Sequence, residues 1–362
     1  MIYKSIGLMS GSSLDGLDIC FAEFQEVSGK WTFAILNADC ISYSQQLLKD
    51  LAIATSLPAK DYLILDVKYG RYIGNQVNEF IEKNNLYHQV AIVSSHGHTT
   101  FHYPESGMTH QLGNGATIAA ETSLPVVSDL RSLDVAFGGQ GAPIVPLGEK
   151  LLFPSTRFFL NLGGIANISI HHDESVIAFD VCPANRVLNL LARQMNKEYD
   201  ENGSVASSGK IHEILLQQLN SLDFYRKEYP KSLANEFGTE IIYPIISAYN
   251  IPIEDALCTY VEHIAVQIKN SIKDFSTTEN SKLMITGGGA FNKFMVERIS
   301  FRLNELSIET FVPGEEIVNY KEALIMALLG ILRWREQPTV LASVTGAQKD
   351  SIGGALWLGS DA

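Results

Sequence analysis

The sequence predicts an α/β protein of two similar lobes, and three observations support this prediction. With 362 residues, 46% of them hydrophobic and 19% charged, the chain can form two domains that each have a core. The two halves repeat one order of elements, namely strands, a helix, a strand and a glycine-rich loop. The glycine turns follow strands, where open α/β sheets usually bind ligands. We therefore expect two α/β lobes that face each other across a central cleft.

The first half begins with a strand, a turn of small residues and a returning strand. The turn, Ser10 to Ser13, contains glycine, free backbone N–H groups and hydroxyls, and a turn of this composition can hold an anion. An apolar strand, a segment with helical periodicity and a strand that ends in glycine come next. These strands are expected at residues 2–9, 19–24, 31–38 and 90–97, and the helix at residues 61–85.

The second half repeats this plan. A strand is broken by "LGGIAN", its return ends in "DVCPAN", and after several helices a further strand ends in "TGGGAFN". The glycine and proline cluster "RSLDVAFGGQGAPIVP" marks the junction between the lobes. The expected lobes are residues 1–133 plus 340–362, with the first phosphate loop, and residues 134–339, with the second phosphate loop and the third glycine turn.

Three glycine turns, "SGSS", "NLGGIAN" and "TGGGAFN", carry the functional signal. Any one of them alone is more simply explained as a turn at the end of a strand. Because two of them occupy equivalent hairpins of opposite lobes, the three together favour a clamp. The hairpins would hold the phosphates of a nucleotide, and the third loop would pack on its base or ribose. Neither G-x-x-x-x-G-K-[ST] nor a strand-linked G-x-G-x-x-G occurs, so P-loop and dinucleotide folds have no motif support.

Charge and cysteine content argue against several classes of function. The net charge of −13 argues against non-specific binding to nucleic acid or to an anionic membrane. The chain enters a strand pattern at once and has no apolar run of membrane-spanning length, so we expect a cytoplasmic protein. Its four cysteines are widely spaced without a CxxC pair, and they predict neither a disulfide framework nor a zinc ribbon: Cys20, Cys40, Cys182 and Cys258.

Several segments, in order along nearly the whole chain, resemble the anhydro-N-acetylmuramic acid kinases. They are "GLMSGSSLDGLD", "SSHGHTTFH", "QLGNGATIAAETSLPVVSDLRSLDVAFGGQGAPIVP", "LNLGGIANI", "FDVCPANRVLN", "ITGGGAFN" and "KEALIMALLG". The family consists of cytoplasmic sugar kinases with the two-lobed, actin-like (ribonuclease H-like) ATPase fold. The resemblance implies ATP-dependent phosphorylation of 1,6-anhydro-N-acetylmuramic acid with hydrolytic opening of its anhydro bridge. The product would be N-acetylmuramic acid 6-phosphate, made during cell-wall (peptidoglycan) recycling, and the enzyme would be a homodimer.

The resemblance assigns the ATP site to the three glycine turns, whose backbone donors can bind phosphoryl oxygens as charge develops. Mg²⁺ takes few protein ligands and keeps several waters, so one carboxylate is enough, and we expect Asp15 to hold it, directly or through water. Turn capping explains Asp18 equally well. The expected ATP-binding residues are Gly11, Ser12, Ser13, Leu14, Asp15, Gly16, Leu17 and Asp18 in the first turn, Asn161, Gly163, Gly164 and Asn167 in the second, and Gly287, Gly288, Gly289 and Asn292 on the adenosine side.

The sugar site is expected where charged side chains lie in loops. Arg131 lies at the inferred lobe junction, where its guanidinium could hold the lactyl carboxylate of the sugar with two hydrogen bonds. An ion pair between Arg131 and Asp134 that ties the lobes together explains these residues equally well. Glu322 could cap a helix that begins at "KEALIMALLG", yet it matches a substrate-contacting glutamate of the family. The expected substrate-binding residues are His98, Arg131, Asp134, Asn185 and Glu322.

The three histidines of "HGHTTFH", His96, His98 and His102, raise the question of zinc. Their even spacing could place the rings on one face of an extended segment. Because no cysteine or second ligand cluster accompanies them, structural or substrate-contacting roles are favoured over metal binding.

Asp180 is the expected catalytic base. It ends the strand "VIAFD" and precedes Pro183, so a rigid turn would hold it in the cleft. There its carboxylate could take the proton from the water that attacks the anomeric carbon, while the departing bridge oxygen receives the γ-phosphoryl group. The alternative is that Asp180 caps the following helix, but Asn185 is better placed for that role.

The chain departs from the family pattern beside the expected base. Val181 and Cys182 stand where the family usually has Thr and Gly, His98 stands for Gln, and Ser12 stands for Thr but keeps the hydroxyl. A side chain at position 182 would narrow the space beside Asp180 and alter the choice of sugar. Two alternatives to the anhydro-sugar kinase therefore stay open: a kinase for another amino sugar without ring opening, and an ATP-gated sugar-binding protein without phosphotransfer.

Overall fold

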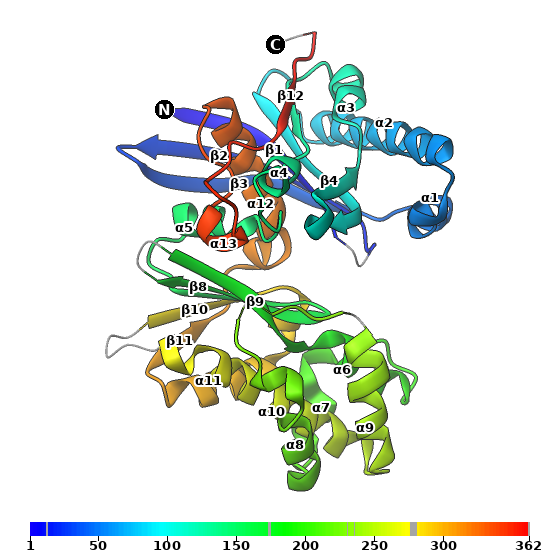
Figure 1. Cartoon of the computed structure of the whole chain (residues 1–362), viewed down its shortest axis with the longest axis vertical. Coiled ribbons are helices and arrows are strands. Elements are labelled where there is room, and N and C mark those ends of the chain that lie inside the picture. Colours follow the sequence, from blue (N-terminus) through cyan, green and yellow to red (C-terminus); the bar gives the residue numbers. More distant parts are fainter. Residues whose placement is uncertain (12–13, 173–174, 230, 235, 276–280, 361–362) are drawn as a thin grey trace. The chain divides into compact units, whose positions relative to one another are not determined.

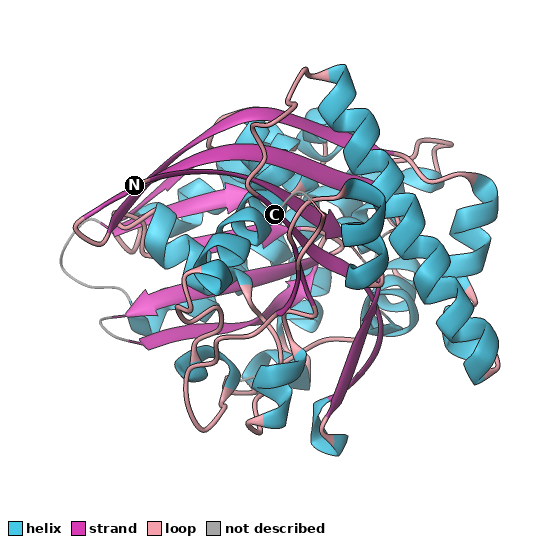
Figure 2. Ribbon diagram, turned by 90° about the horizontal axis from the view of Figure 1, so that it is seen from above, coloured by secondary structure: helices cyan, strands magenta, loops and turns pink. Residues whose placement is uncertain are grey.

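Two α/β units, each built around one mixed sheet, make up the chain (Figure 1). The computed structural model describes all residues except 12–13, 173–174, 230, 235, 276–280 and 361–362. The first unit comprises Met1–Phe153 and Tyr320–Ala362, and the second comprises Pro154–Asn319. Figure 2 shows strands and helices intermixed throughout, which is typical of the α/β class.

The boundaries between the units differ from those that the sequence pattern indicated, 133/134 and 339/340. Two helices account for the difference. α5 (Val145–Leu152) and the larger part of α12 (Glu315–Trp334) bury apolar side chains, among them Leu147 and Leu328, in a core of the first unit. Burial against a sheet, rather than the nearby glycine and proline cluster, therefore decides to which unit these residues belong.

The first sheet combines an antiparallel meander with parallel strands. Its strands are β1 (Ile2–Ser10), β2 (Leu17–Val27), β3 (Lys30–Ile41), β4 (Ile92–Tyr103), β5 (Met108–Leu112), β6 (Val126–Ser128) and β12 (Ala355–Trp357). The order is β12-β6-β4-β1-β2-β3, and β5 pairs with β4. β2 pairs antiparallel with β1 and with β3, whereas β4 pairs in parallel with the other side of β1, and β6 in parallel with β4.

Helices contribute to the cores on both faces of this sheet because its strands are apolar on both sides. Ile19 and Phe21 of β2 belong to one core, whereas Cys20 and Ala22 belong to another, formed with α5 and α12. Successive strand residues point to opposite faces, so the continuous apolar run of β2 is what burial on both sides requires. The expected helix at residues 61–85 is α2 (Ala59–Lys83). Besides α2, α5 and α12, the helices of this unit are α1 (Gln45–Ala52), α3 (Gly115–Thr122), α4 (Ser132–Ala136) and α13 (Ala342–Thr345).

The second sheet repeats the strand order of the first. Its strands are β7 (Phe158–Leu162), β8 (Ile165–His172), β9 (Ser175–Pro183), β10 (Ser281–Thr286) and β11 (Ile308–Phe311), in the order β11-β10-β7-β8-β9. Again three strands form an antiparallel meander, and β10 and β11 add in parallel beside the first of them. The order β6-β4-β1-β2-β3 of the first sheet matches β11-β10-β7-β8-β9 of the second, which confirms the predicted duplication.

The helices of the second unit complete an apolar core on one face of its sheet. Leu160, Ile168 and Ile285 point into this core, and Figure 1 shows α6, α8, α10 and α11 on the same side of the sheet. The helices are α6 (Asn185–Arg193), α7 (Ser204–Ser208), α8 (Glu213–Asn220), α9 (Tyr243–Ala248), α10 (Ile253–Ile272) and α11 (Lys293–Asn304). In the part of the chain that the structure describes, no helix is long and apolar enough to cross a membrane.

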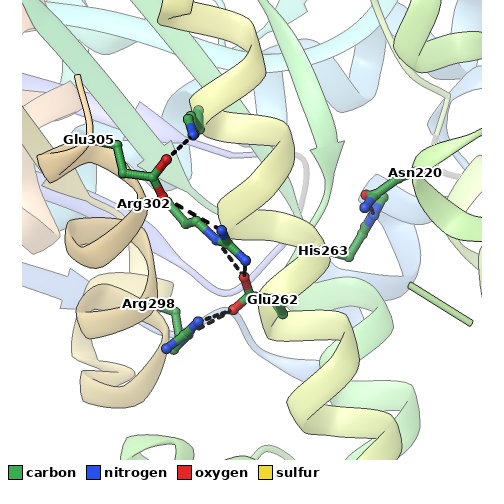
Figure 3. A network of polar contacts seen from close by, with 7 residues as sticks. Asn220, Glu262, His263, Arg298, Arg302 and Glu305 are labelled. Carbon is green, nitrogen blue, oxygen red and sulfur yellow. Dashed lines mark hydrogen bonds and ion pairs between the residues drawn. The ribbon is translucent and has the colours of Figure 1, made fainter. Parts of the chain in front are cut away.

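A buried carboxylate joins two of these helices (Figure 3). Glu262 of α10 is 1% exposed and accepts hydrogen bonds from two arginines of α11, from Arg298 Nε at 2.7 Å and from Arg302 Nε at 2.6 Å. Figure 3 also shows Glu305 beside Arg302, at the end of the same helix. Because a buried charge is tolerated only when it is paired, Glu262 specifies how α10 and α11 pack.

Candidate functional site

The turn between β1 and β2 is the first expected ATP loop. Within it, Leu14 N donates a hydrogen bond to Gly11 O at 3.3 Å. Leu14 has a φ of 60°, which is uncommon for an apolar side chain, and such backbone strain clusters at functional turns. Ser12 and Ser13, which were also expected to bind ATP, lie outside the described residues.

The fold itself explains two of the expected ATP-binding residues, Gly16 and Leu17. A Cβ atom at Gly16 would lie 2.7 Å from Ile41 O and 2.9 Å from Cys40 Sγ, so only glycine packs here against β3. Leu17 is 1% exposed and belongs to a core of the first unit, which leaves only its backbone for a ligand.

Asp18 and Asp15 form an acidic pair near this turn. Asp18 lies within β2, opposite Cys40 of β3, so it does not cap the turn. Burial raises the pKa of Asp18 to about 6, a hydrogen bond with the Cys40 side chain opposes this, and the charges of Glu322 and Asp15 raise the pKa further. Asp15 is exposed. Two carboxylates that repel each other, one of them open to solvent, fit Mg²⁺, a hard cation that prefers oxygen ligands.

Arg131 is held beside a neutral histidine. Its Nε donates to His96 Nε2 at 2.9 Å, and its Nη1 donates to Gly141 O at 2.7 Å. Since arginine only donates, His96 Nε2 must accept, and the hydrogen of the ring sits on Nδ1, 2.8 Å from Gly97 O. Burial, and then the charge of Arg131, lowers the pKa of His96 to about 3. His96 therefore orients the guanidinium, which keeps further N–H groups for a ligand.

Asp134 has a different partner from the one expected. Among the described contacts it forms no ion pair with Arg131. Its Oδ1 accepts from Thr345 Oγ1 at 2.7 Å, its Oδ2 accepts from Gly141 N at 2.8 Å, and its side chain is fully buried. All these residues belong to the first unit, so the expectation that Arg131 and Asp134 tie the lobes together is wrong. Asp134 shapes the loop whose carbonyl, at Gly141, accepts from Arg131.

Glu322 does not open its helix. α12 begins at Glu315, two turns earlier, which rules out the capping role. Burial raises the pKa of Glu322, while the charges of Lys321 and Arg131 lower it. The structure thus places Glu322, Arg131 and Asp18 in one electrostatic group of the first unit.

His98 ends a chain of hydrogen bonds that starts in the core. Tyr69 OH lies 2.8 Å from Tyr43 OH, Tyr43 OH donates to Ser10 Oγ at 2.8 Å, and Ser10 Oγ lies 3.3 Å from His98 Nδ1. Because Tyr43 uses its only hydrogen, the Ser10 hydroxyl can donate to Nδ1, which leaves the ring hydrogen on Nε2. Burial lowers the pKa of His98, so the ring is neutral at neutral pH and can offer one N–H donor to a ligand.

The histidine segment does not form a metal centre of several ligands. His102 Nδ1 lies 3.0 Å from Thr109 Oγ1, and His96 is bonded to Arg131. No group of three or more histidine, cysteine, aspartate or glutamate side chains among the described residues could hold a metal ion.

A row of polar side chains crosses the second sheet. Thr286 of β10, Asn161 of β7, Asn167 of β8 and Asp180 of β9 are direct partners from one strand to the next. Directly opposed residues place their side chains on the same face. Their apolar neighbours in sequence point into the core that the helices complete, so the row lies on the other face. It brings the expected base together with two expected ATP-binding residues.

Asp180 is held by its neighbours rather than by a helix. Asn167 Nδ2 donates a hydrogen bond to Asp180 Oδ1, and Leu233 N donates to Oδ2 at 2.7 Å. Burial raises the pKa of Asp180, and these two hydrogen bonds oppose the increase. The pairing of β8 and β9 shifts at Val181, and such bulges re-aim side chains near active sites. Helix α6 has Ala184 as its N-cap and no side-chain capping bond, so the capping alternative for Asp180 is wrong.

Asn185 does not cap α6 either, contrary to the expectation. It is the first residue of the helix, and its Nδ2 donates to Leu162 O at 2.9 Å. The backbone N–H groups of residues 184–186 donate instead to the carbonyl oxygens of residues 163–164, which closes the helix start. Asn185 therefore ties α6 to the second glycine turn.

The glycines of the second and third turns fall into two groups. At Gly163, Gly164 and Gly288 an added Cβ would meet no atom closer than 3.5 Å, and none of the three has a left-handed φ. At Gly289 the Cβ would lie 2.6 Å from a leucine side chain, and Gly287 has a φ of 80°, so the turn itself requires these two. The fold would accept a Cβ at Gly163, Gly164 and Gly288, and glycines that the fold does not require are typical of places where a ligand approaches the backbone.

Asn292, expected on the adenosine side, is the N-cap of α11, and its Oδ1 accepts from Met295 N at 3.0 Å. One further expectation changes with the structure. Val181 and Cys182 are 1% and 0% exposed and belong to the apolar core. Cys182 therefore does not narrow the polar face beside Asp180, contrary to the expectation.

Sequence reasoning missed the partners that hold the functional side chains. Leu233 lies 53 positions from Asp180 and contributes only its backbone N–H, which carries no sequence signal. No sequence motif indicates that Tyr43 pairs with Ser10 either. The polar row could have been predicted from the sequence, because Asn161 and Asn167 stand at matched positions on either side of the second glycine turn.

Comparison with known proteins places the chain in one family. The family model described as anhydro-N-acetylmuramic acid kinase matches residues 3–359. The anhydro-N-acetylmuramic acid kinase of Photobacterium profundum is 32% identical over 98% of this chain and 99% of the relative, and that of Aliivibrio fischeri is 33% identical over the same shares. Among solved structures, one similar chain is component A of the (R)-2-hydroxyglutaryl-CoA dehydratase of Acidaminococcus fermentans. The match covers 91% of this chain and 97% of that chain, with 11% sequence identity and a TM-score of 0.47. A likeness this low carries no argument about function. The chain therefore belongs to the anhydro-N-acetylmuramic acid kinase family.

Proposed function

We propose that this protein is an ATP-dependent kinase that opens the anhydro bridge of 1,6-anhydro-N-acetylmuramic acid and phosphorylates the sugar to N-acetylmuramic acid 6-phosphate in peptidoglycan recycling. The observation that carries the proposal is the held carboxylate of Asp180 near open glycine turns, in a chain that matches the family over residues 3–359. A base and a phosphate-binding backbone are what coupled hydrolysis and phosphoryl transfer require.

ATP would bind at the glycine turns. The backbone at Gly163, Gly164 and Gly288 can approach phosphoryl oxygens, because these residues carry no side chain of their own and the fold does not crowd the Cβ position. Asp15 and Asp18 would hold Mg²⁺, and the cation would supply positive charge that offsets the negative charge of the phosphates. A bound cation would also relieve the repulsion that adds to the effect of burial on the pKa of Asp18.

The sugar would bind to Arg131, His98 and Glu322. Arg131 keeps N–H groups beyond the two that are bonded within the protein, and these suit the lactyl carboxylate. His98 offers one neutral N–H donor, and Glu322 accepts from a sugar hydroxyl. Asp134 is left out of this set, because both of its oxygens are already bonded inside the first unit.

The reaction can be followed bond by bond. Asp180 takes a proton from a water molecule as the water oxygen bonds to the anomeric carbon. The bond between that carbon and the bridge oxygen breaks, the bridge oxygen keeps the electron pair and attacks the γ-phosphorus of ATP, and ADP leaves. One carboxylate therefore serves both bond changes, because the bridge oxygen becomes a nucleophile only as water adds.

Asp180→Asn, assayed with the anhydro sugar and Mg-ATP in oxygen-18 water, tests the proposal. The wild type should yield a phosphorylated sugar with label at the anomeric position. The variant should lose about two to four orders of magnitude in turnover with ATP affinity nearly unchanged. Unlabelled wild-type product would mean phosphorylation without ring opening, and a variant with near wild-type turnover would remove Asp180 from the mechanism.

We expect turnover to decrease at low pH, where the Asp180 carboxylate becomes protonated. Burial raises the pKa of Asp180 above the ordinary value of 3.8, so the base becomes protonated at a higher pH than an exposed aspartate. Turnover should therefore fall as the pH decreases through this raised pKa. A pH series of kcat checks this, and the same acid limb in Asp180→Asn would assign it to another group.

The proposal includes a cytoplasmic homodimer, which rests on family resemblance alone. Sedimentation velocity of the purified protein should show a dimer at micromolar concentration. A purely monomeric protein would contradict this part.

A further inference from the structure

We propose that Asn167 and the segment Lys231–Leu233 form a clamp that positions Asp180, so that Asn167 serves the catalytic base rather than ATP. The inference rests on the proposed function, because it takes Asp180 to be the base. It makes Asn167 a positioning residue and adds to the site a stretch of chain that no motif marks.

Strand register places Asn167 for this role. It is the direct partner of Asp180 across β8 and β9, and its Nδ2 donates to Asp180 Oδ1. An ionised carboxylate only accepts, so the asparagine must present its NH₂ group. Asn161 is the partner of Asn167 on the opposite side, in β7, and among the described contacts it has no bond to Asp180. The two asparagines thus share a row, and Asn167 is the one that touches the base.

The segment Lys231–Leu233 covers the edge of the sheet at the base. β9 is the last strand of the order, so its outer edge is open to a further partner. Asp180 N donates to Lys231 O at 3.1 Å, and Leu233 N donates to Asp180 Oδ2 at 2.7 Å. Among the described contacts each carboxylate oxygen therefore receives one hydrogen bond, which leaves a lone pair on each for the attacking water.

Aromatic contacts hold the segment on β9. Lys231 Nζ lies 5.8 Å from the ring centre of Phe179 and 4.9 Å from that of Phe224. Tyr229 stacks on Phe179 with the ring centres 5.8 Å apart. Because Phe179 is the residue before Asp180, these contacts fix the segment directly beside the base, and so fix where the N–H of Leu233 stands.

The clamp has a measurable consequence for the proton affinity of the base. Burial raises the pKa of Asp180, and the bonds from Leu233 and Asn167 lower it because both stabilise the ionised form. The other titratable groups near it are Cys182 on its own strand, a buried thiol, and Lys231 on the segment, whose ammonium lies over aromatic rings. Removal of the Asn167 amide should therefore raise the pKa of Asp180 further, because the ionised form loses one hydrogen bond.

The kinetic test compares Asn167→Ala with Asn161→Ala, a matched change one strand away. For Asn167→Ala we expect kcat to fall about ten- to a hundredfold, KM for ATP to stay within about twofold, and the acid limb of kcat to move to higher pH. For Asn161→Ala we expect a raised KM for ATP and an unmoved acid limb. Asn167→Thr, whose side chain favours strands, replaces the alanine variant if that variant does not fold.

A second readout needs no catalytic activity. The difference in unfolding free energy between wild type and Asp180→Asn changes with pH around the native pKa of Asp180. The same difference, measured in the Asn167→Ala background, should change at a higher pH. If the pH midpoint of this stability difference does not move and Asn167→Ala has a raised KM for ATP, the clamp is overturned and Asn167 returns to the ATP site. If the wild type transfers no phosphate, the proposed function fails, whereas the midpoint still decides the clamp.

Discussion

Replacement of Gly164 by alanine should separate ligand binding from folding. An added Cβ would lie 3.7 Å from its nearest neighbour, Arg186 Nε, which is an ordinary contact, and φ at this position is not left-handed. Because alanine restricts the unfolded chain more than glycine does, the free energy of unfolding should stay the same or rise by up to about 1 kcal/mol. Nucleotide affinity should fall at least about tenfold, or about 1.4 kcal/mol, because the methyl group takes the space of a phosphoryl oxygen.

Gly289→Ala is the matched control for this prediction. There the Cβ would lie 2.6 Å from Leu162 Cβ and 2.9 Å from Met295 Cε, so overpacking should cost about 1–3 kcal/mol. Urea unfolding measures the stabilities, and calorimetric titration with a non-hydrolysable ATP analogue and Mg²⁺ measures the affinities. The reasoning is refuted if folded Gly164→Ala binds the analogue as the wild type does, or if both variants lose stability alike.

Two further predictions concern carboxylates that the fold buries. Near pH 8, Asp18→Asn should raise the free energy of unfolding by about 1–2 kcal/mol, a range that allows for solvent screening of a partly buried group. Near pH 4 the same substitution should change the free energy of unfolding by almost nothing. The reason is that burial has raised the pKa of Asp18 to about 6, so the fold disfavours only the ionised form. Denaturation over pH checks this against Asp39→Asn, an exposed ion-pair partner of Lys83 that should gain nothing. Glu262→Ala should lower the free energy of unfolding by about 3 kcal/mol, because two arginines lose a buried partner, whereas the exposed Glu305→Ala should cost far less. Equal losses for these two variants would contradict the role of burial.

The α/β class, the duplication and the family were all accessible from sequence. Apolar runs with strand spacing, helical periodicity and glycine turns are local signals, and β1, β2, β3 and α2 lie where these signals occur. Short connections make neighbouring strands pair, so the two meanders also follow from chain order. The motifs also singled out Asp180 and the glycine turns as candidate site residues, because these signals depend on neighbouring residues only.

Side-chain partners did not follow from chain order. Asp134 lies three positions from Arg131 and suggested an ion pair, yet it bonds to Thr345, 211 positions away. Cys182 is two positions from Asp180 and was expected to narrow the space beside it, yet it points into the core because the bulge at Val181 changes the alternation. In both cases tertiary packing, rather than proximity in the sequence, determines what the side chain contacts.

The elements and their order were thus decided locally, whereas the contacts that hold the Asp180 carboxylate and orient the Arg131 guanidinium were decided by packing. Asn167 and Leu233 meet Asp180 only because a strand partner and a distant segment converge on β9, and His96 meets Arg131 only after β4 has paired within its sheet. The physical reason is that secondary structure depends on interactions between residues near in the chain. Burial and hydrogen-bond partners, and with them the pKa values, depend on segments brought together from far apart, which leave no periodic mark in the sequence.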